Sequence, residues 1–326
     1  MTDVLVLGGT GWLSERIARR WRDAGARVTC LARGGRPSPD GTVLLRGDRD
    51  DPDVYEQLRA QHWDEVIDVS RHAKQVRAAV AALGGSTDHF TYVSSVSVYA
   101  DETTLAQDES APLHEPAQDG DEYEYAAQKV AAEQAVRMLG ERAFIVRPGL
   151  IVGDGDPSDR FGYWAAAFAR AGSEPVLTPT AEGRFVQIID VDDLAAYVTA
   201  ELRDGTVNAT GDVRAFADVM ASVREAAGHT GEIVEVDDEW LVQQGVQYWT
   251  GERSLPLWVP DAMRGFMRRE NDAYRASGGT FTPLDATVRA VLDDERARGL
   301  DRERGAGLDR ADELELLGRL SRSRAD

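Results

Sequence analysis

The sequence contains few of the residues that build disulfides and metal sites. Its 326 residues include one cysteine, Cys30, and five histidines that show no ligand spacing. A single cysteine cannot form an internal disulfide or a cysteine-based metal site. We therefore expect a cytoplasmic protein that has no metal ligands.

Acidic residues outnumber basic ones, and the chain lacks long apolar runs. The formal net charge is −20, from 37 Lys and Arg against 57 Asp and Glu, so the field of the protein opposes binding to nucleic acids and to anionic membranes. No apolar run reaches the ~20 residues that span a bilayer. The N-terminal residues lack the basic region and apolar core of a secretory signal. We expect neither a nucleic-acid partner nor a membrane association.

Strand patterns alternate with amphipathic helix patterns along the first half of the chain. Such alternation predicts an α/β fold with crossover helices, in which a parallel sheet is doubly wound in the Rossmann manner. The predicted strands are Val4–Leu7, Arg27–Leu31, Thr42–Arg46, Glu65–Val69, His89–Ser94 and Ala143–Arg147. The predicted helices are Leu13–Ala24, Asp53–Gln61, Ala73–Leu83 and Tyr123–Leu139.

Later segments predict a return to this sheet and a second lobe. A strand over Arg184–Ile189, a helix over Val191–Leu202 and a strand over Thr206–Asn208 extend the pattern. We therefore expect a Rossmann domain from residues 1–152 and 184–210, and a smaller C-terminal lobe for substrate from residues 153–183 and 211–326. The end of the chain, Asp301–Asp326, predicts a surface helix followed by a frayed tail.

A glycine-rich turn follows the first predicted strand and opens the first helix. It reads Gly8-Gly9-Thr10-Gly11-Trp12-Leu13-Ser14. Glycine there permits a tight turn and lets the backbone approach a pyrophosphate at the positive end of the helix. Ser14 stands at the third glycine position and is small enough for close packing. The turn predicts a dinucleotide site.

The ends of the second and third strands indicate which dinucleotide. An acidic residue after the second strand would bind the ribose 2′-hydroxyl of NAD, whereas this chain has Arg33 there. A guanidinium suits a 2′-phosphate. After the third strand, Asp48 is placed to accept from the adenine amino group, with Arg49 beside it. We expect NADP, with NAD as the less favoured cofactor.

Tyr125 and Lys129 lie four residues apart, on one face of a predicted helix. The chain has only two lysines, Lys74 and Lys129, so a chance pairing at this spacing is rare. The strand before this helix ends in Ser94 and Ser95, at the edge of the sheet where ligands bind in open α/β folds.

Together these motifs resemble the short-chain dehydrogenase/reductase superfamily. Further motifs are similar to its extended branch, which contains epimerases and dehydratases of sugar nucleotides. They are Glu133 after Lys129, Arg147–Gly153, and Ile189–Ala195 before Asn208. The resemblance covers about residues 4 to 210 and is specific for the superfamily rather than for a reaction.

The resemblance implies a role for each motif. Tyr125 would be the general acid/base, and Lys129 would hold the nicotinamide ribose and lower the tyrosine pKa, which is ordinarily near 10. Ser95 would bond the reacting oxygen, with Ser94 or Ser97 as alternatives. The implied cofactor contacts are Gly8, Thr10, Gly11, Trp12, Leu13, Arg33, Asp48, Arg49, Val69, Ser70, Lys129, Pro148, Gly149 and Leu150.

Two positions depart from the epimerase and dehydratase patterns. Val96-Ser97 stands where dehydratases carry an Asp-Glu pair, and Leu150 stands where the epimerase-like branch has Asn. We therefore expect an NADP(H)-dependent oxidoreductase acting on a carbonyl or alcohol of a neutral or cationic small molecule. One alternative is an epimerase of a sugar or sugar nucleotide. The other is a cofactor-sensing regulator without catalysis. The resemblance also implies a homodimer through the helix of Tyr125.

Two regions allow more than one interpretation. Residues 101–124 contain nine acidic side chains, which form either a solvated loop or an acidic rim that favours neutral or cationic substrates. Asp154–Trp164, Phe185, Gln187 and Trp258 are either pocket walls or core.

Overall fold

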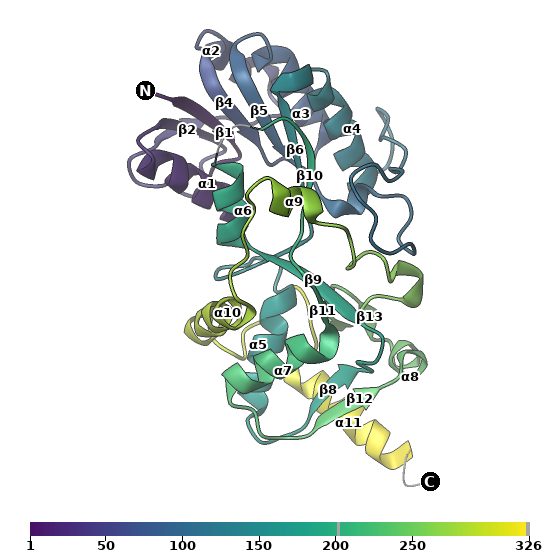
Figure 1. Ribbon diagram of the computed structural model, residues 1–326. Helices are drawn as coiled ribbons and strands as arrows, with labels where there is room; N and C mark the ends of the chain where they lie inside the picture. The colour runs from purple at the N-terminus through teal and green to yellow at the C-terminus, as the bar shows by residue number, and fades with distance from the viewer. Residues whose placement is uncertain (201–202, 324–326) are drawn as a thin grey trace. The chain divides into compact units, whose positions relative to one another are not determined.

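A computed structural model describes residues 1–200 and 203–323, and the chain forms two compact units (Figure 1). The first unit contains Met1–Ile151, Val191–Gly211 and Arg269–Phe281. The second contains Val152–Asp190, Asp212–Arg268 and the chain from Thr282 onward.

A seven-stranded parallel sheet forms the centre of the first unit (Figure 1). Its strands are β1 (Asp3–Leu7), β2 (Arg27–Ala32), β3 (Val43–Arg46), β4 (Trp63–Asp68), β5 (Thr87–Val93), β6 (Ala143–Pro148) and β10 (Gly205–Ala209). They lie in the order β10-β6-β5-β4-β1-β2-β3. The order reverses between β1 and β4, so the two halves diverge there and the expected Rossmann-type fold is confirmed.

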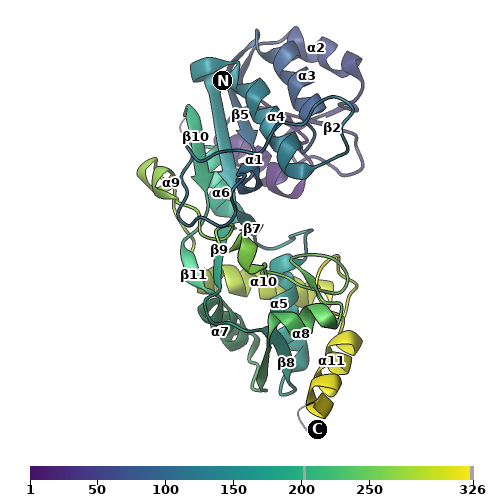
Figure 2. The same cartoon turned by 90° about the vertical axis from the view of Figure 1, so that its right-hand side faces the viewer.

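Helices cover this sheet in packed pairs. Their bounds are α1 (Trp12–Asp23), α2 (Glu56–Arg59), α3 (Ala73–Leu83), α4 (Tyr125–Arg137), α6 (Val191–Val198) and α9 (Asp272–Ala276). Helix α3 packs on α4 and helix α1 on α6, whereas α9 lies beside β10 (Figure 2). Side chains of α3 and α4 form a core with the sheet around Trp63, Phe90 and Tyr92.

The start of α4 has a local cause. The sequence predicts a helix from Tyr123, but the structure begins it at Tyr125. The Glu124 carboxylate accepts a 2.7 Å hydrogen bond from the amide of Ala127, and a capping residue itself lies outside helical geometry. The cap therefore makes Tyr125 the first residue of the helix.

The predicted return of Arg184–Ile189 to the large sheet is wrong. Strand β9 (Phe185–Asp190) pairs antiparallel with β11 (Val213–Ala215), in a three-stranded sheet of order β11-β9-β7. Strand β9 belongs to the second unit, whereas α6 and β10 return to the first as expected. The first unit also includes residues 269–281, where the Asn271 side chain donates to the carbonyls of Thr210 and Gly211 at 3.0 and 2.9 Å.

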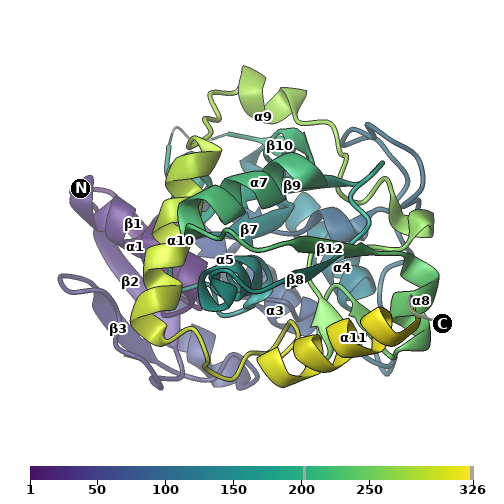
Figure 3. The same cartoon turned by 90° about the horizontal axis from the view of Figure 1, so that it is seen from below.

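The second unit combines small sheets with packed helices (Figure 3). The chain enters this unit at Val152, the last residue of β7 (Leu150–Val152). The other strands of the unit are β8 (Val176–Pro179), β12 (Ile233–Val236), β13 (Gln247–Tyr248) and β14 (Ser254–Leu255). Its helices are α5 (Arg160–Ala171), α7 (Phe216–Ala227), α8 (Asp238–Gln243), α10 (Leu284–Arg298) and α11 (Arg310–Ser323). Helices α5, α7 and α10 pack against one another.

Helix α11 is more than a surface helix. It buries Leu316, Leu317 and Leu320 along one side. Its Glu313 is also buried and accepts hydrogen bonds from the amide of Leu177 at 3.1 Å and from Arg310 at 2.6 Å. Residues 324–326, the end of the segment for which a frayed tail is predicted, lie outside the described part of the chain. Among the described helices, none has the length and apolar character required to traverse a bilayer.

Candidate active site

A cavity of about 710 Å³ lies at the carboxyl ends of β1 to β4 in the first unit. Eight of the predicted cofactor contacts line it, namely Gly8, Thr10, Gly11, Arg33, Asp48, Arg49, Val69 and Ser70. The size falls within the few hundred to a thousand Å³ typical of small-molecule sites. Its position at the point where the strand order reverses is where open α/β sheets bind nucleotides.

The glycine turn that borders the cavity depends on close backbone approaches. Gly8 has φ +86°, which side-chain-bearing residues rarely adopt. A Cβ on Gly9 would lie 2.6 Å from Cys30 Sγ in β2, so only glycine fits against that strand.

Ser14 ties this turn together from inside α1. Its hydroxyl donates to the Gly8 carbonyl at 2.6 Å and accepts from the Gly11 amide at 3.1 Å. The turn leaves the first-turn amides of α1, a twelve-residue helix, at the positive end of the helix dipole. A pyrophosphate fits this arrangement, because it needs a close backbone and a positive helix end.

The cavity carries exposed cations where it meets the segment after β2. Arg33 and Arg36 line it, are exposed, and form no ion pair with any described residue. Asp48 also lines the cavity and accepts from the amide of Asp50 at 3.0 Å.

Lys129 is buried on α4, with 2 % of its surface exposed. Its Nζ donates to the carbonyl of Val93 at 2.7 Å and to that of Ser70 at 2.9 Å. Burial lowers the pKa of Lys129 to about 7, although the carboxylates of Asp68 and Glu133 act to raise it. The ammonium also lies 4.7 Å from the ring centre of Tyr92 and 5.9 Å from that of Tyr125.

The serines after β5 have different partners. Ser95 is nearly buried, and its hydroxyl accepts from the Ser97 amide and donates to the Ser97 hydroxyl, both at 3.1 Å. Ser94 donates to Glu133 Oε1 on α4 at 2.6 Å. Because Lys129 binds Val93, the start of α4 lies against the segment that carries Ser95.

Glu133 is the centre of a buried network that sequence reasoning did not place in the site. The Arg147 guanidinium donates to both of its carboxylate oxygens, at 2.9 and 2.7 Å. Arg147 also donates to the Tyr99 hydroxyl at 2.9 Å, and Tyr99 donates to Asn208 at 2.6 Å. Burial acts to raise the pKa of Glu133, but the bonds from Arg147 hold it below its usual value. The network joins α4 to β6 and β10.

Other predicted contacts lie outside the cavity lining. Trp12 and Leu13 begin α1, and the Arg16 guanidinium lies 5.5 Å from the Trp12 ring centre. Pro148, Gly149 and Leu150 follow one another at the carboxyl end of β6.

The second unit has a cavity of its own, of about 180 Å³. Phe185, a predicted pocket wall, lines it together with Leu257 and Met267. Trp164 and Trp258 are instead fully buried core residues. The Arg184 guanidinium at this cavity pairs with Asp238 and donates to the carbonyls of Thr180 and Val259.

Several carboxylates of the acidic segment have local structural partners in the first unit. Asp101 accepts from the amide of Thr103 at 2.8 Å, and Asp108 accepts from the amide of Ser110 at 2.9 Å. Glu109 accepts from the amide of Asn208 at 2.6 Å. These three carboxylates therefore stabilise the backbone of the segment and its contact with β10.

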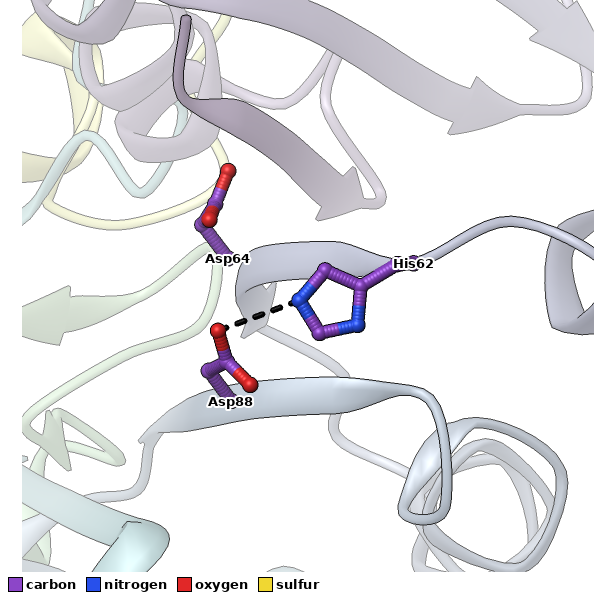
Figure 4. Close-up of side chains that lie close together, drawn as sticks. All are labelled: His62, Asp64 and Asp88. Atoms are coloured by element: carbon purple, nitrogen blue, oxygen red, sulfur yellow. Dashed lines mark hydrogen bonds and ion pairs between the residues drawn. The ribbon is translucent and has the colours of Figure 1, made fainter.

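The opposite edge of the sheet brings together His62, Asp64 and Asp88 (Figure 4). Their ligand atoms all lie within 4.8 Å of one another, a grouping that the sequence spacing did not indicate. His62 bonds Asp88 at 3.0 Å, and Asp64 accepts from the Asp3 amide at 2.6 Å. These contacts account for the three side chains without an ion.

Comparison with known proteins adds a family and relatives. Residues 4–213 match the model of the NAD dependent epimerase/dehydratase family. A ceramide reductase of Caulobacter vibrioides is 27% identical over 278 residues, which cover 78% of this chain and 80% of that protein.

Solved structures share the fold. UDP-N-acetylglucosamine 4-epimerase from Bacillus cereus matches with a TM-score of 0.66 and 16% identity, over 92% of this chain and 100% of that chain. The Bordetella bronchiseptica enzyme WbmH, in complex with NAD⁺, matches with a TM-score of 0.63 and 16% identity, over 91% and 99%. With more than half of its length matched by the family model, this chain belongs to the NAD dependent epimerase/dehydratase family, in the extended branch of the short-chain dehydrogenases/reductases, and is an NAD(P)-dependent enzyme of that family.

Proposed function

We propose that this chain is an NADP(H)-dependent oxidoreductase that moves hydride between nicotinamide and a carbonyl or alcohol substrate. The observation that carries the proposal is the position of Ser70. This residue lines the cavity next to the glycine turn, and its carbonyl holds the ammonium of Lys129, four residues from Tyr125. Cofactor site and proton donor are therefore connected through one backbone carbonyl.

Three side chains provide the proton chemistry in this proposal. When bound, the cofactor supplies or accepts the hydride. Tyr125 donates its phenolic proton to the carbonyl oxygen during reduction and takes it back during oxidation. The positive charge of Lys129 stabilises the phenolate that Tyr125 becomes when it gives up its proton. The Ser95 hydroxyl, which donates to Ser97 in the structure, turns that hydrogen bond to the reacting oxygen and orients it.

The preference for NADP rests on charge at the adenosine end of the cavity. Arg33 stands after β2, where an NAD-specific site carries an acidic residue, and Arg36 lies close by in the lining. A charge-assisted bond from a guanidinium to the 2′-phosphate favours NADP over NAD. The WbmH structure contains NAD⁺, and for this reason we retain NAD as the alternative cofactor.

A reductase of an uncharged substrate agrees best with the chain's own residues. Leu150 replaces the amide of the epimerase-like branch, and Arg184 at the cavity of the second unit is neutralised by Asp238. The similarity to a ceramide reductase supports this class and adds ceramide-type lipids to the substrates to be tested. The family model and the epimerase structures favour the second candidate, an epimerase that returns the hydride to its own substrate.

Two measurements test the proposal. Fluorescence titration should give tighter binding of NADPH than of NADH, and a reversed order would remove the NADP assignment. Turnover of uncharged ketones, enones and ceramide-type lipids should consume NADPH in stoichiometric amounts, whereas isomerisation of sugar nucleotides without net loss of cofactor would establish the epimerase instead.

The proposal extends to assembly and location. A homodimer through α4 should give a light-scattering mass of twice the chain, and a monomer would contradict it.

A cytoplasmic location accords with the single thiol, Cys30, which is buried and whose pKa burial raises to about 11. Fractionation of the native cells tests the location.

A further inference from the structure

Asp68 lies fully buried at the carboxyl end of β4 and binds two partners at once. Its Oδ1 accepts from the amide of Ser70 at 2.8 Å. The guanidinium of Arg49 donates to both carboxylate oxygens, at 2.8 and 2.6 Å. A bidentate pair of this kind fixes direction as well as distance.

Arg49 is occupied inside the protein although it borders the cavity. Its Nε donates to the Tyr55 hydroxyl at 3.0 Å, and Nη2 also donates to the Gln75 carbonyl at 2.9 Å. Burial acts to lower the pKa of Arg49, but the charge of Asp68 and the bond to it raise that pKa above its usual value. The guanidinium thus serves as a fixed support for Asp68.

Ser70 transmits this support to α4. Its amide is held by Asp68, and its hydroxyl donates to the Gln75 side chain at 2.8 Å. Its carbonyl accepts from Tyr92 at 3.1 Å and from Lys129 at 2.9 Å. Ser70, whose carbonyl binds the Lys129 ammonium, is therefore held at its amide, its side chain and its carbonyl.

The charges around Lys129 come from three directions. Asp68 from β4 and Glu133 from α4 favour the ammonium, while Arg71, from the loop after β4, opposes it. The rings of Tyr92 on β5 and Tyr125 on α4 are the titratable neighbours from the remaining directions. Both carboxylates are paired with an arginine, Glu133 with Arg147 and Asp68 with Arg49. Asp68 also binds the amide of Ser70, whose carbonyl accepts from the lysine, so it combines charge with a hydrogen-bonded path to Lys129.

We propose that Asp68, held by Arg49, is a positioning residue that orients the Ser70 carbonyl and keeps Lys129 charged beside Tyr125. The proposal rests on the proposed role of Lys129 as the partner of Tyr125. It assigns Arg49 to the support of this group rather than to direct binding of cofactor.

The two-lysine composition makes the test direct. Protein labelled with ¹³C at the lysine ε carbons should give two signals, one from buried Lys129 and one from exposed Lys74, which serves as internal reference. We would titrate wild type, Asp68→Asn and the control Asp88→Asn, all without cofactor. Asn still accepts from the Ser70 amide but carries no charge.

The expected result is a drop of about one pH unit or more in the Lys129 midpoint of Asp68→Asn, because loss of a nearby opposite charge disfavours the ammonium. Lys74 should not move, and Asp88→Asn should match wild type. A folded Asp68→Asn protein with an unchanged Lys129 midpoint would overturn the proposal.

A second variant covers the case in which Asp68→Asn does not fold. The double variant Arg49→Met/Asp68→Asn removes both charges of the buried Arg49–Asp68 pair, so that Arg49 is not left as an unpaired buried charge. Its Lys129 midpoint should also fall, because Asp68 and not Arg49 is among the charges that act on the lysine. An unchanged midpoint in this variant contradicts the proposal equally.

Kinetics separate this inference from the proposed function. With an active substrate, Asp68→Asn should shift the pH profile of kcat to lower pH at nearly unchanged NADPH affinity, and an unshifted profile would count against the inference. A shifted lysine signal together with full turnover by Tyr125→Phe would retain the positioning role and refute the proposed mechanism.

Discussion

The Lys129 ammonium donates a 2.9 Å hydrogen bond to the carbonyl of Ser70, a residue that lines the cavity at the end of β4. This single contact links the helix that carries Tyr125 to the site that the glycine turn forms. A buried cation without a carboxylate in direct contact is costly unless it has a function or strong partners nearby. We therefore expect mutations at the cavity, near Ser70, to change the properties of Lys129 and of the helix that carries Tyr125.

Removal of the Tyr125 hydroxyl should abolish turnover and spare cofactor binding. We expect Tyr125→Phe to lower kcat by about 10²- to 10⁴-fold, the usual range for losing a general acid. NADPH affinity should remain close to wild type in a fluorescence titration. The matched control is Tyr123→Phe, which removes an exposed hydroxyl two residues away and should retain full activity. Equal rates in Tyr125→Phe and wild type would exclude the tyrosine from the mechanism.

Arg33 should determine the choice between the two cofactors. We expect Arg33→Gln to weaken NADPH binding by about tenfold or more, since a charged hydrogen bond to the 2′-phosphate is lost, and to leave NADH affinity nearly the same. Calorimetry with both cofactors measures this. Arg20→Gln, an exposed arginine on α1 that does not line the cavity, is the control. A parallel loss of both affinities would mean that Arg33 does not read the 2′-phosphate.

An added methyl group at Gly9 should damage the site from within. The new Cβ would lie 2.6 Å from Cys30 Sγ, and overpacking of this kind costs about 1–3 kcal/mol. We expect Gly9→Ala to lower Tm and weaken NADPH binding because the turn must move away from β2. Gly85→Ala, where a Cβ meets nothing within 4 Å, should behave as wild type. A Gly9→Ala protein with unaltered Tm and affinity would show that the turn has more room than the structure indicates.

Lys129 should make stability depend on pH. Burial lowers its folded-state pKa to about 7 from the ordinary 10.5, so between these values the unfolded chain binds more protons. The wild-type free energy of unfolding should therefore rise with pH relative to Lys129→Met over this window, and remain parallel to it below pH 7. Urea unfolding of both proteins across the range measures the difference. Parallel curves throughout would mean that the folded lysine titrates normally.

His89 should have the opposite dependence. Burial acts to lower its pKa, but the bonds to Glu65 and to the Arg203 carbonyl raise the folded-state value above the ordinary 6.5. Its contribution is full below pH 6.5 and is lost as the pH rises through the folded-state pKa. The advantage of wild type over His89→Gln in unfolding free energy should thus shrink on going from acid to alkaline pH. A constant advantage would contradict a charged His89–Glu65 pair.

The fold of the first unit follows closely from local patterns. Helix α3 has the bounds that its apolar periodicity predicts, Ala73–Leu83, and the strands of the large sheet differ from prediction by one or two residues. Periodicity does not choose a strand's partner, however. Strand β9 therefore looked like a member of the large sheet, although its residues pair with β11 instead.

The site divides in the same way. The glycine turn and the Tyr125–Lys129 pair each consist of residues that are close together in the sequence. Both motifs could therefore be predicted from the sequence alone. The partners of Arg49 could not be read, because Asp68 lies nineteen residues away on another strand. The hydrogen bond from the Ser94 hydroxyl to Glu133 could not be predicted either, because the two residues lie thirty-nine positions apart.

The amino-acid sequence by itself determined the alternation of strands and helices, the glycine turn and the helix that carries Tyr125 and Lys129, since each depends on neighbouring residues and on one period of the backbone. Only the tertiary structure decided that Arg49 pairs with Asp68 and that the Ser94 hydroxyl donates to Glu133. These side-chain partners come from segments that are distant in the chain, so folding must bring them together before they can bond.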